Sequence, residues 1–288
     1  QLVRRKLMKN MAARQEAVSV YTKKVDKVRN KKYLHAIPII SFFVLWEVIT
    51  RLNINFSIVN PVFFPPPSLI FLNGVELFHS GLITDSIVSS TIRIVIGFAI
   101  GVFLGVIAAL LIGRVEKIEF WFMPVFNMIG PIPALALLPL FIIWFGIGEI
   151  PKIILIAWTT FFPVMTNTFD GIKSVHSSYI RSALSLGAND RQIFKKIIIP
   201  STLPNIFTGC QISLGLAFSA LVVSEMMGAK SGLGYIIVDA RNYMKILNMY
   251  VAIILIGIEY SLFSLLLKVI EKKLLKWRTG GFENAVEK

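Results

Sequence analysis

The sequence predicts an all-α, polytopic membrane protein with about six transmembrane helices and a basic helical hairpin inserted between two of them. Hydrophobic residues make up 55% of the 288 residues and charged residues only 16%, and the mean hydropathy is +0.72. Soluble domains usually carry about a quarter charged residues. Here the apolar residues gather in long runs that match the ~20 residues needed to cross a bilayer.

Six such runs give the expected spans, at about 33–50, 88–113, 120–148, 151–169, 203–225 and 246–268. The third run is too long for one straight helix and contains Pro124, Pro131, Pro133 and Pro139. Proline removes a backbone donor and clashes with the preceding turn. We therefore expect one broken span with its break at Gly130–Pro133, and a re-entrant segment followed by a span is the alternative.

The distribution of Lys and Arg predicts the orientation of the spans. Basic residues crowd residues 1–32 and follow the second, fourth and sixth spans, whereas Leu52–Ile92 contains none. Only the loop after the fifth span runs weakly against this trend. We expect a multi-pass protein of the cell (inner or plasma) membrane with both termini in the cytoplasm. Its parts are a basic tail at 1–32, a transmembrane region at 33–275 and a tail at 276–288.

The formal net charge of +14 could indicate nucleic-acid binding, but its placement at the predicted cytoplasmic ends favours topology and attraction to anionic lipid headgroups. The sequence has one Cys and three His, which form no metal-ligand pattern. No phosphate-binding loop is present, because the glycine spacing around Gly228–Ser231 is wrong for one. We therefore predict no catalytic residue, no metal site and no nucleic-acid partner.

The stretch from Tyr179 to Pro204 predicts a basic helix–glycine–helix hairpin. Apolar residues cluster at helical spacing on both sides of Gly187, which can supply the left-handed geometry of a helix C-cap. Asn189 or Asp190 can cap the second helix. We expect Pro200 and Pro204 to end that helix and to open the fifth span. An amphipathic basic hairpin could also lie on the membrane surface.

The spacing within this hairpin resembles the EAA motif of permease subunits of binding-protein-dependent ABC importers. The resemblance implies that 171–203 is a coupling loop whose first helix sits in a groove of the ATPase subunit. Arg181 stands where the motif has Glu, which puts in doubt any salt bridge that the Glu would make. The coupling residues implied are Arg181, Ser182, Ala183, Leu184, Leu186, Gly187, Ala188, Phe194, Ile197, Pro200 and Pro204.

Further segments are similar to the sulfonate, taurine, nitrate and bicarbonate branch of this family. They are residues 64–68, Ser89 with Arg93, residues 131–135, 138–140 and 144–148, Ser224 with Glu225, and residues 232–235. The resemblance implies the type I importer permease fold and a non-catalytic subunit. It also implies two permease copies that form a homodimer, two ABC ATPase subunits that bind ATP and Mg, and an external solute-binding protein.

The cargo implied by this branch is a small anion such as an aliphatic sulfonate, taurine or nitrate. Similar permeases also serve thiamine-precursor-like and other organic solutes, so that class stays open. A secondary transporter without an ATPase is a second hypothesis, but the sequence has no convincing internal repeat and few acidic groups. An ion channel would need a filter-like segment or a charge ring, and the sequence contains neither.

Several residues within the spans have two interpretations each. Gly97, Gly101 and Gly105 allow close helix packing, either within the chain or against a second permease copy. Glu225 ends a long uncharged run, and a carboxylate there is costly. It could face the translocation path or a gate, pair with a base such as Arg241, or lie at the external interface. The residues with a path or gate role are Asn127, Thr166, Asn167 and Glu225; interhelical hydrogen bonding is the alternative for the three uncharged ones.

Overall fold

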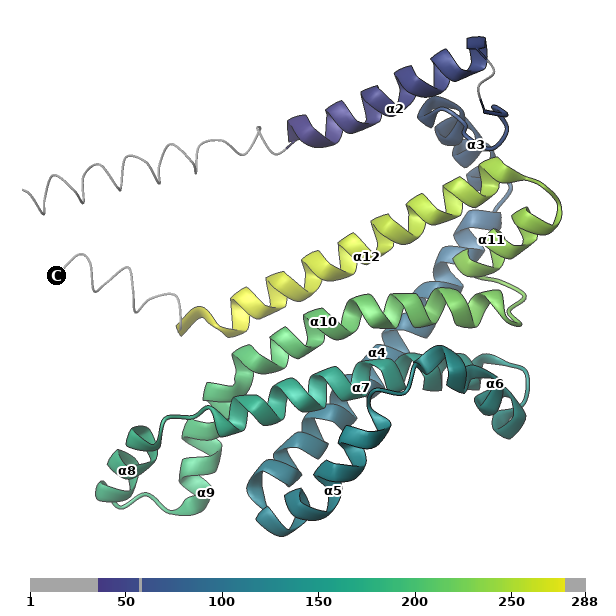
Figure 1. Cartoon of the computed structure of the whole chain (residues 1–288). Helices are drawn as coiled ribbons and strands as arrows, with labels where there is room; N and C mark the ends of the chain where they lie inside the picture. The colour runs from purple at the N-terminus through teal and green to yellow at the C-terminus, as the bar shows by residue number, and fades with distance from the viewer. Residues whose placement is uncertain (1–35, 57–58, 278–288) are drawn as a thin grey trace, which may run out of the picture. The chain divides into compact units, whose positions relative to one another are not determined.

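The computed structural model describes residues 36–56 and 59–277, and all regular elements in these ranges are helices (Figure 1). The predicted all-α class is confirmed. The tail at 1–32, the first residues of the first expected span and residues 278–288 lie outside the described ranges. The elements are α2 (Ala36–Phe56), α3 (Pro67–His79), α4 (Leu82–Arg114), α5 (Glu116–Ile129), α6 (Ala134–Phe145), α7 (Glu149–Lys173), α8 (Ser177–Ser185), α9 (Asp190–Ile193), the π-helical turn η2 (Phe194–Ile198), α10 (Ile199–Met226), α11 (Leu233–Asn242) and α12 (Ile246–Leu274).

Five helical stretches of the described chain are long and apolar enough to cross a membrane, and a sixth is added if the bent pair α5–α6 counts as one span. The five are α2, α4, α7, the continuous stretch Asp190–Met226, and α12. Each overlaps one of the predicted runs and extends beyond it at one or both ends. The short helices α3 and α11 were not predicted, because their sequences fall in the loops expected between spans.

The third run is broken where the prolines predict. Helix α5 ends at Ile129 and α6 begins at Ala134, and the two helices are bent by 99°. The break at Gly130–Pro133 is therefore confirmed. A broken span and a re-entrant segment both contain such a bend. Pro124 and Pro139 lie inside α5 and α6 rather than at the break.

The chain divides into two compact units, residues up to Leu69 and residues from Ile70 onward. In the first unit, the proline-rich segment after α2 is fastened to that helix. Glu47 accepts hydrogen bonds from the backbone N–H of Ser68 at 3.0 Å and from its hydroxyl at 2.8 Å. The side chain of Asn53 bonds both the N–H and the carbonyl of Val59 at 2.8 Å. These bonds satisfy polar groups that an apolar span leaves without partners.

In the second unit, α7 is the central helix and packs most extensively against α4 and α10. Small residues allow the close approach of α4 to α7. A Cβ added at Gly97 would lie 2.7 Å from Ile156, and one at Gly101 would lie 2.5 Å from Thr160. A Cβ at Gly105 would lie 2.8 Å from a backbone carbonyl of α7. The glycine face of α4 is thus covered by α7 of the same chain. Of the two interpretations of these glycines, the structure shows packing within the chain.

The main apolar core lies between these three helices and α6. Its fully or almost fully buried members are Ile94, Leu138, Phe141, Leu155, Ile156, Leu214, Ala217, Phe218, Ala220 and Leu221. A smaller cluster joins α11 to α12 through Leu233, Ile236 and Ala252. Helices α4, α6, α7 and α10 therefore form one packed body that fixes the groups described next.

Candidate functional site

The hairpin at α8–α9 is built by local sequence signals. Gly187 has a φ of 81°, so the predicted left-handed glycine is confirmed. The N–H of Ala188 donates to the carbonyl of Ala183 at 3.0 Å, and the N–H of Gly187 donates to that of Leu184 at 2.9 Å. This pair of bonds is the Schellman ending of a helix. Asn189 then caps α9 with a complete capping box.

The expected end of the second hairpin helix is wrong. Pro200 and Pro204 do not terminate it, because the chain continues through η2 into α10 and Pro204 lies inside that helix. Pro200 is the second residue of α10, which follows η2 without a break. The wider π-helical turn at Phe194–Ile198 precedes Pro200, and such turns accommodate interruptions of the α-helical ladder. The second hairpin helix is therefore continuous with the membrane helix α10.

The tip of the hairpin exposes apolar side chains. Leu186 is 88% exposed, Tyr179 63% and Leu184 51%. Arg181 and Ser182 are also exposed, whereas Ala183 and Ala188 are half-buried. A Cβ at Gly187 would meet no atom within 4 Å. The first hairpin helix thus presents a free, mixed apolar and basic surface.

The base of the hairpin is tied to the membrane helices. The guanidinium of Arg114, the last residue of α4, lies 5.2 Å from the ring centroid of Phe194. Lys173 at the end of α7 pairs with Glu119 of α5 at 2.6 Å. Ile193 is buried, and Phe194 and Ile197 are half-buried. The second hairpin helix therefore contacts the end of α4 and continues into α10.

A charged cluster joins the opposite ends of α7 and α10, away from the hairpin. Arg93 of α4 is only 4% exposed; it donates to Glu225 at 2.7 Å and pairs with Glu149 through both its Nε and its Nη2. Lys152 also bonds Glu149, at 2.9 Å. We call Arg93, Glu149, Lys152 and Glu225 the four-charge cluster. Its two positive and two negative groups balance, as buried charges require.

Backbone and hydroxyl groups complete this cluster. Glu225 accepts from the hydroxyl of Ser90 and from the N–H of Gly234, both at 2.8 Å. A Cβ at Gly232 would lie 2.5 Å from the carboxylate of Glu225, so only glycine lets the loop before α11 approach so closely. The cluster therefore connects α4, α7, α10 and the start of α11.

This cluster corrects the interpretation of Glu225. Its carboxylate is wholly buried and its base is Arg93, not Arg241, which is exposed on α11. Glu225 therefore takes part in a buried ion pair within the packed body. Sequence reasoning noted Arg93 as a family-like position and considered Arg241 as the base for Glu225, but it did not predict the contact between Arg93 and Glu225. The sequence did contain a signal for this contact, because Glu225 and Arg93 are an acid and a base that each border a long uncharged run.

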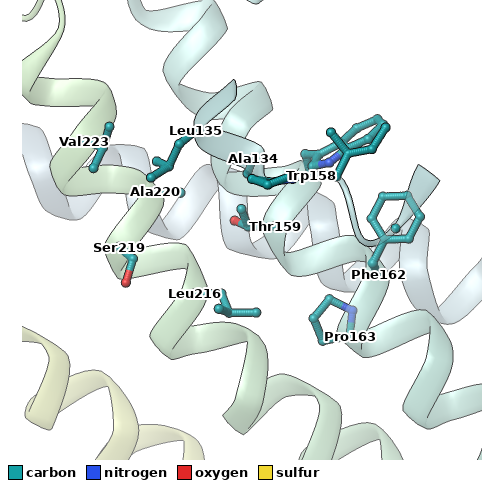
Figure 2. A pocket seen from close by; sticks show the side chains of 13 residues that line it. Ala134, Leu135, Trp158, Thr159, Phe162, Pro163, Leu216, Ser219, Ala220 and Val223 are labelled. Atoms are coloured by element: carbon teal, nitrogen blue, oxygen red, sulfur yellow. The ribbon is translucent and has the colours of Figure 1, made fainter. Parts of the chain in front are cut away.

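A cavity of about 350 Å³ lies between the α5–α6 break, α7 and α10. Figure 2 shows the labelled side chains of α7 and α10 on either side of it, with Ala134 and Leu135 of α6 between them. Its volume falls within the ~300–1,000 Å³ of small-molecule pockets. The lining residues are Gly130, Ile132, Pro133, Ala134, Leu135, Trp158, Thr159, Phe162, Pro163, Leu216, Ser219, Ala220 and Val223.

None of the four residues given a path or gate role lines this cavity. Asn127 and Thr166 are exposed on α5 and α7. Asn167 is half-buried and donates to the carbonyl of Pro163 in its own helix at 2.8 Å. That bond is not the interhelical one expected as the alternative for Asn167. The cavity was missed because its lining is almost entirely apolar, and in sequence such residues are indistinguishable from lipid-facing ones.

Residues 101–278 match the family described as "Binding-protein-dependent transport system inner membrane component". A Bacillus subtilis (strain 168) protein named "Putative aliphatic sulfonates transport permease protein SsuC" is 38% identical over 82% of this chain and 84% of its own. Escherichia coli (strain K12) taurine transport system permease protein TauC is 33% identical over 81% and 85%. The formylaminopyrimidine transport permease protein ThiX of Halalkalibacterium halodurans is 32% identical over 82% and 92%.

Two solved transporters share the fold at low sequence identity. A chain of the MetNI methionine ABC transporter in an inward-facing conformation aligns with a TM-score of 0.56 at 19% identity, over 67% of this chain and 96% of that one. A chain of an amino acid ABC transporter crystallised with histidines aligns with a TM-score of 0.53 at 21% identity, over 71% and 97%.

Proposed function

Because this chain belongs to the family of binding-protein-dependent transport system inner membrane components, we propose that it is the permease subunit of an ATP-driven importer for organic sulfonates. The chain itself carries out no chemistry. Two permease copies form the path, two ABC ATPase subunits bind ATP and Mg, and an external binding protein delivers the solute. The resemblance of the sequence to the EAA motif and the geometry of the hairpin support this assembly.

One observation carries the ATPase assignment, namely the exposed hairpin tip. Leu184 and Leu186 expose apolar surface on a helix whose end is fixed by a Schellman ending. Apolar side chains exposed on a rigid, basic hairpin are suited to insertion into a protein groove. Closure of the ATPase dimer around ATP would draw two hairpins together and switch the path from inward-open to outward-open.

The orientation follows from the same assignment. A hairpin that docks on an ATPase lies in the cytoplasm, in agreement with the Lys/Arg bias, and both termini then also lie there. The four-charge cluster, at the other ends of α7 and α10, faces the external side. There it would hold α4, α7, α10 and α11 together as one block while the path opens and closes.

The cargo class follows from the relatives named for aliphatic sulfonates and taurine. A small organic sulfonate is therefore the first candidate. A thiamine-precursor-like organic solute is the second, since a relative of similar identity is named for formylaminopyrimidine transport.

Co-purification tests the class of transporter. The tagged permease, expressed with an ABC ATPase from the same organism, should be recovered as a stable complex with one ATPase subunit for each permease chain. Replacing the exposed Leu186 by Asp should weaken that complex, whereas the same change at Ile147, an 83% exposed residue in the loop between α6 and α7, leaves the hairpin untouched and serves as the control. Gradient-driven uptake by the permease alone would instead establish a secondary transporter.

A further inference from the structure

The side chains that line the cavity at the α5–α6 break indicate which part of a cargo molecule the cavity can hold. Within the described residues, its lining contains no Asp, Glu, Lys, Arg or His. The hydroxyl of Thr159 already donates to the carbonyl of Ile156 at 2.9 Å, and that of Ser219 donates to Gly215 at 3.1 Å. A hydroxyl has a single proton to donate. Both groups therefore offer an incoming ligand only acceptor oxygens, which an anion does not need.

One side-chain donor of the lining remains unused. The indole N–H of Trp158 is buried and has no partner among the described residues. A single neutral donor is far too little to compensate for the hydration that a small inorganic anion would lose on entering an apolar cavity. The walls formed by Trp158, Phe162 and Leu216 are instead suited to hydrocarbon.

The same cavity is a poor place for a lipid tail. Gly130, Ile132 and Pro133, which form the break between α5 and α6, belong to its lining. Backbone that leaves a helix at membrane depth is tolerated where it contacts protein or water, not where it contacts lipid. Discontinuous membrane helices are also the usual site of substrate binding in transporters. The lining is therefore better suited to contact with protein, water or cargo than to contact with a lipid tail.

We propose that this cavity takes the hydrocarbon portion of an organic sulfonate as the cargo crosses, with the charged head left on the water-filled side of the path. This inference rests on the proposed function and narrows its cargo. Alkanesulfonates with longer chains suit the cavity better than taurine, whose ammonium group is strongly hydrated, and far better than nitrate. Each added methylene that reaches the cavity favours binding by about fourfold.

The test compares two cargo lengths in the complete importer. Initial uptake of ethanesulfonate and hexanesulfonate is measured below saturation in proteoliposomes that contain the permease, its ATPase and its binding protein. Leu216→Trp fills the cavity, because Leu216 lines it and is 48% exposed. The matched control is Leu262→Trp on α12, at a 62% exposed residue that does not line the cavity.

We expect Leu216→Trp to reduce hexanesulfonate uptake relative to ethanesulfonate uptake by on the order of tenfold, the contribution of roughly two methylene groups. Leu262→Trp should leave the ratio unchanged. Leu216→Ala enlarges the cavity and should retain uptake of hexanesulfonate. It is the control for the possibility that Leu216→Trp loses uptake because it misfolds. Recovery of each variant with the ATPase verifies that it is folded.

Equal ratios in Leu216→Trp and Leu262→Trp would overturn the cavity assignment while sulfonate uptake by the wild type still supported the proposed function. The cavity assignment would also be overturned if a lipid copurified with the wild type, was lost from Leu216→Trp, and was not displaced by hexanesulfonate. If the wild type transports neither sulfonate although the binding protein stimulates its ATPase, the sulfonate cargo of the proposed function itself is wrong.

Discussion

Replacing Arg93 by Met should destabilise the protein more than any other single change in the four-charge cluster. Arg93 is 4% exposed and is the base that neutralises the wholly buried carboxylate of Glu225. Methionine keeps much of the side-chain volume and removes the charge. The variant therefore leaves Glu225 buried without its ion-pair partner, while Glu149 keeps Lys152.

The expected size of the effect follows from these contacts. Breaking a buried ion pair from one side costs about 3–5 kcal/mol. Glu225 keeps two neutral donors, the hydroxyl of Ser90 and the N–H of Gly234, so the lower end of about 3 kcal/mol applies. Glu149→Gln should cost less, about 1–3 kcal/mol, because Glu149 itself is 54% exposed but its loss leaves the buried Lys152 without its ion-pair partner.

Thermal unfolding of the purified protein in detergent, followed by tryptophan fluorescence, measures this ranking. Arg93→Met should have the lowest Tm, and Glu149→Gln should lie between it and the wild type. The double variant Arg93→Met/Glu225→Met should recover most of the loss, because an apolar pair of similar volume replaces a buried ion pair at little cost. A double variant no more stable than Arg93→Met, or a Tm for Arg93→Met equal to that of Glu149→Gln, would refute the assignment of Glu225 to a structural ion pair.

Three further changes test the packing and the hairpin. Gly101→Ala should destabilise the protein by about 1–3 kcal/mol, because its Cβ would lie 2.5 Å from Thr160. The control is Gly257→Ala in α12, where no atom lies within 4 Å of the added Cβ; it should be neutral or stabilising by up to about 1 kcal/mol. Thermal unfolding measures both variants. Gly232→Ala should lower the Tm more than Gly146→Ala, since both glycines have positive φ but only at Gly232 would a Cβ collide with Glu225; equal shifts would contradict the close approach. Asn189→Ala removes the capping box and should cost the second hairpin helix about 1 kcal/mol, visible as faster hydrogen exchange confined to α9; unchanged exchange there would show that the cap is unimportant.

The features that the sequence predicts best are local. The broken third span follows from prolines that act on their own turn, and the hairpin follows from Gly187 and Asn189, whose bonds all lie within six residues. The long helices follow from apolar runs. Each of these depends on interactions that a short window of sequence contains.

The features that the sequence does not predict depend on how distant helices pack. Arg93 and Glu225 are 132 residues apart in the chain, and Arg241 was the nearer base. The cavity is formed by three separate helices whose apolar residues look alike whether they face lipid, core or path. The outcome at Pro200 and Pro204 depended on η2, and a proline by itself does not reveal whether a helix ends or continues through a wider turn.

The most direct test of the central claim is the ratio of cargo uptake to ATP hydrolysis in the reconstituted importer with Gly187→Pro. Proline fixes φ near −65°, whereas Gly187 has a φ of 81° and donates its N–H to Leu184. The substitution should therefore distort the hairpin that docks on the ATPase. We predict that hydrolysis continues while uptake falls to background. Uptake at the wild-type rate and ratio would contradict the role of this hairpin in coupling.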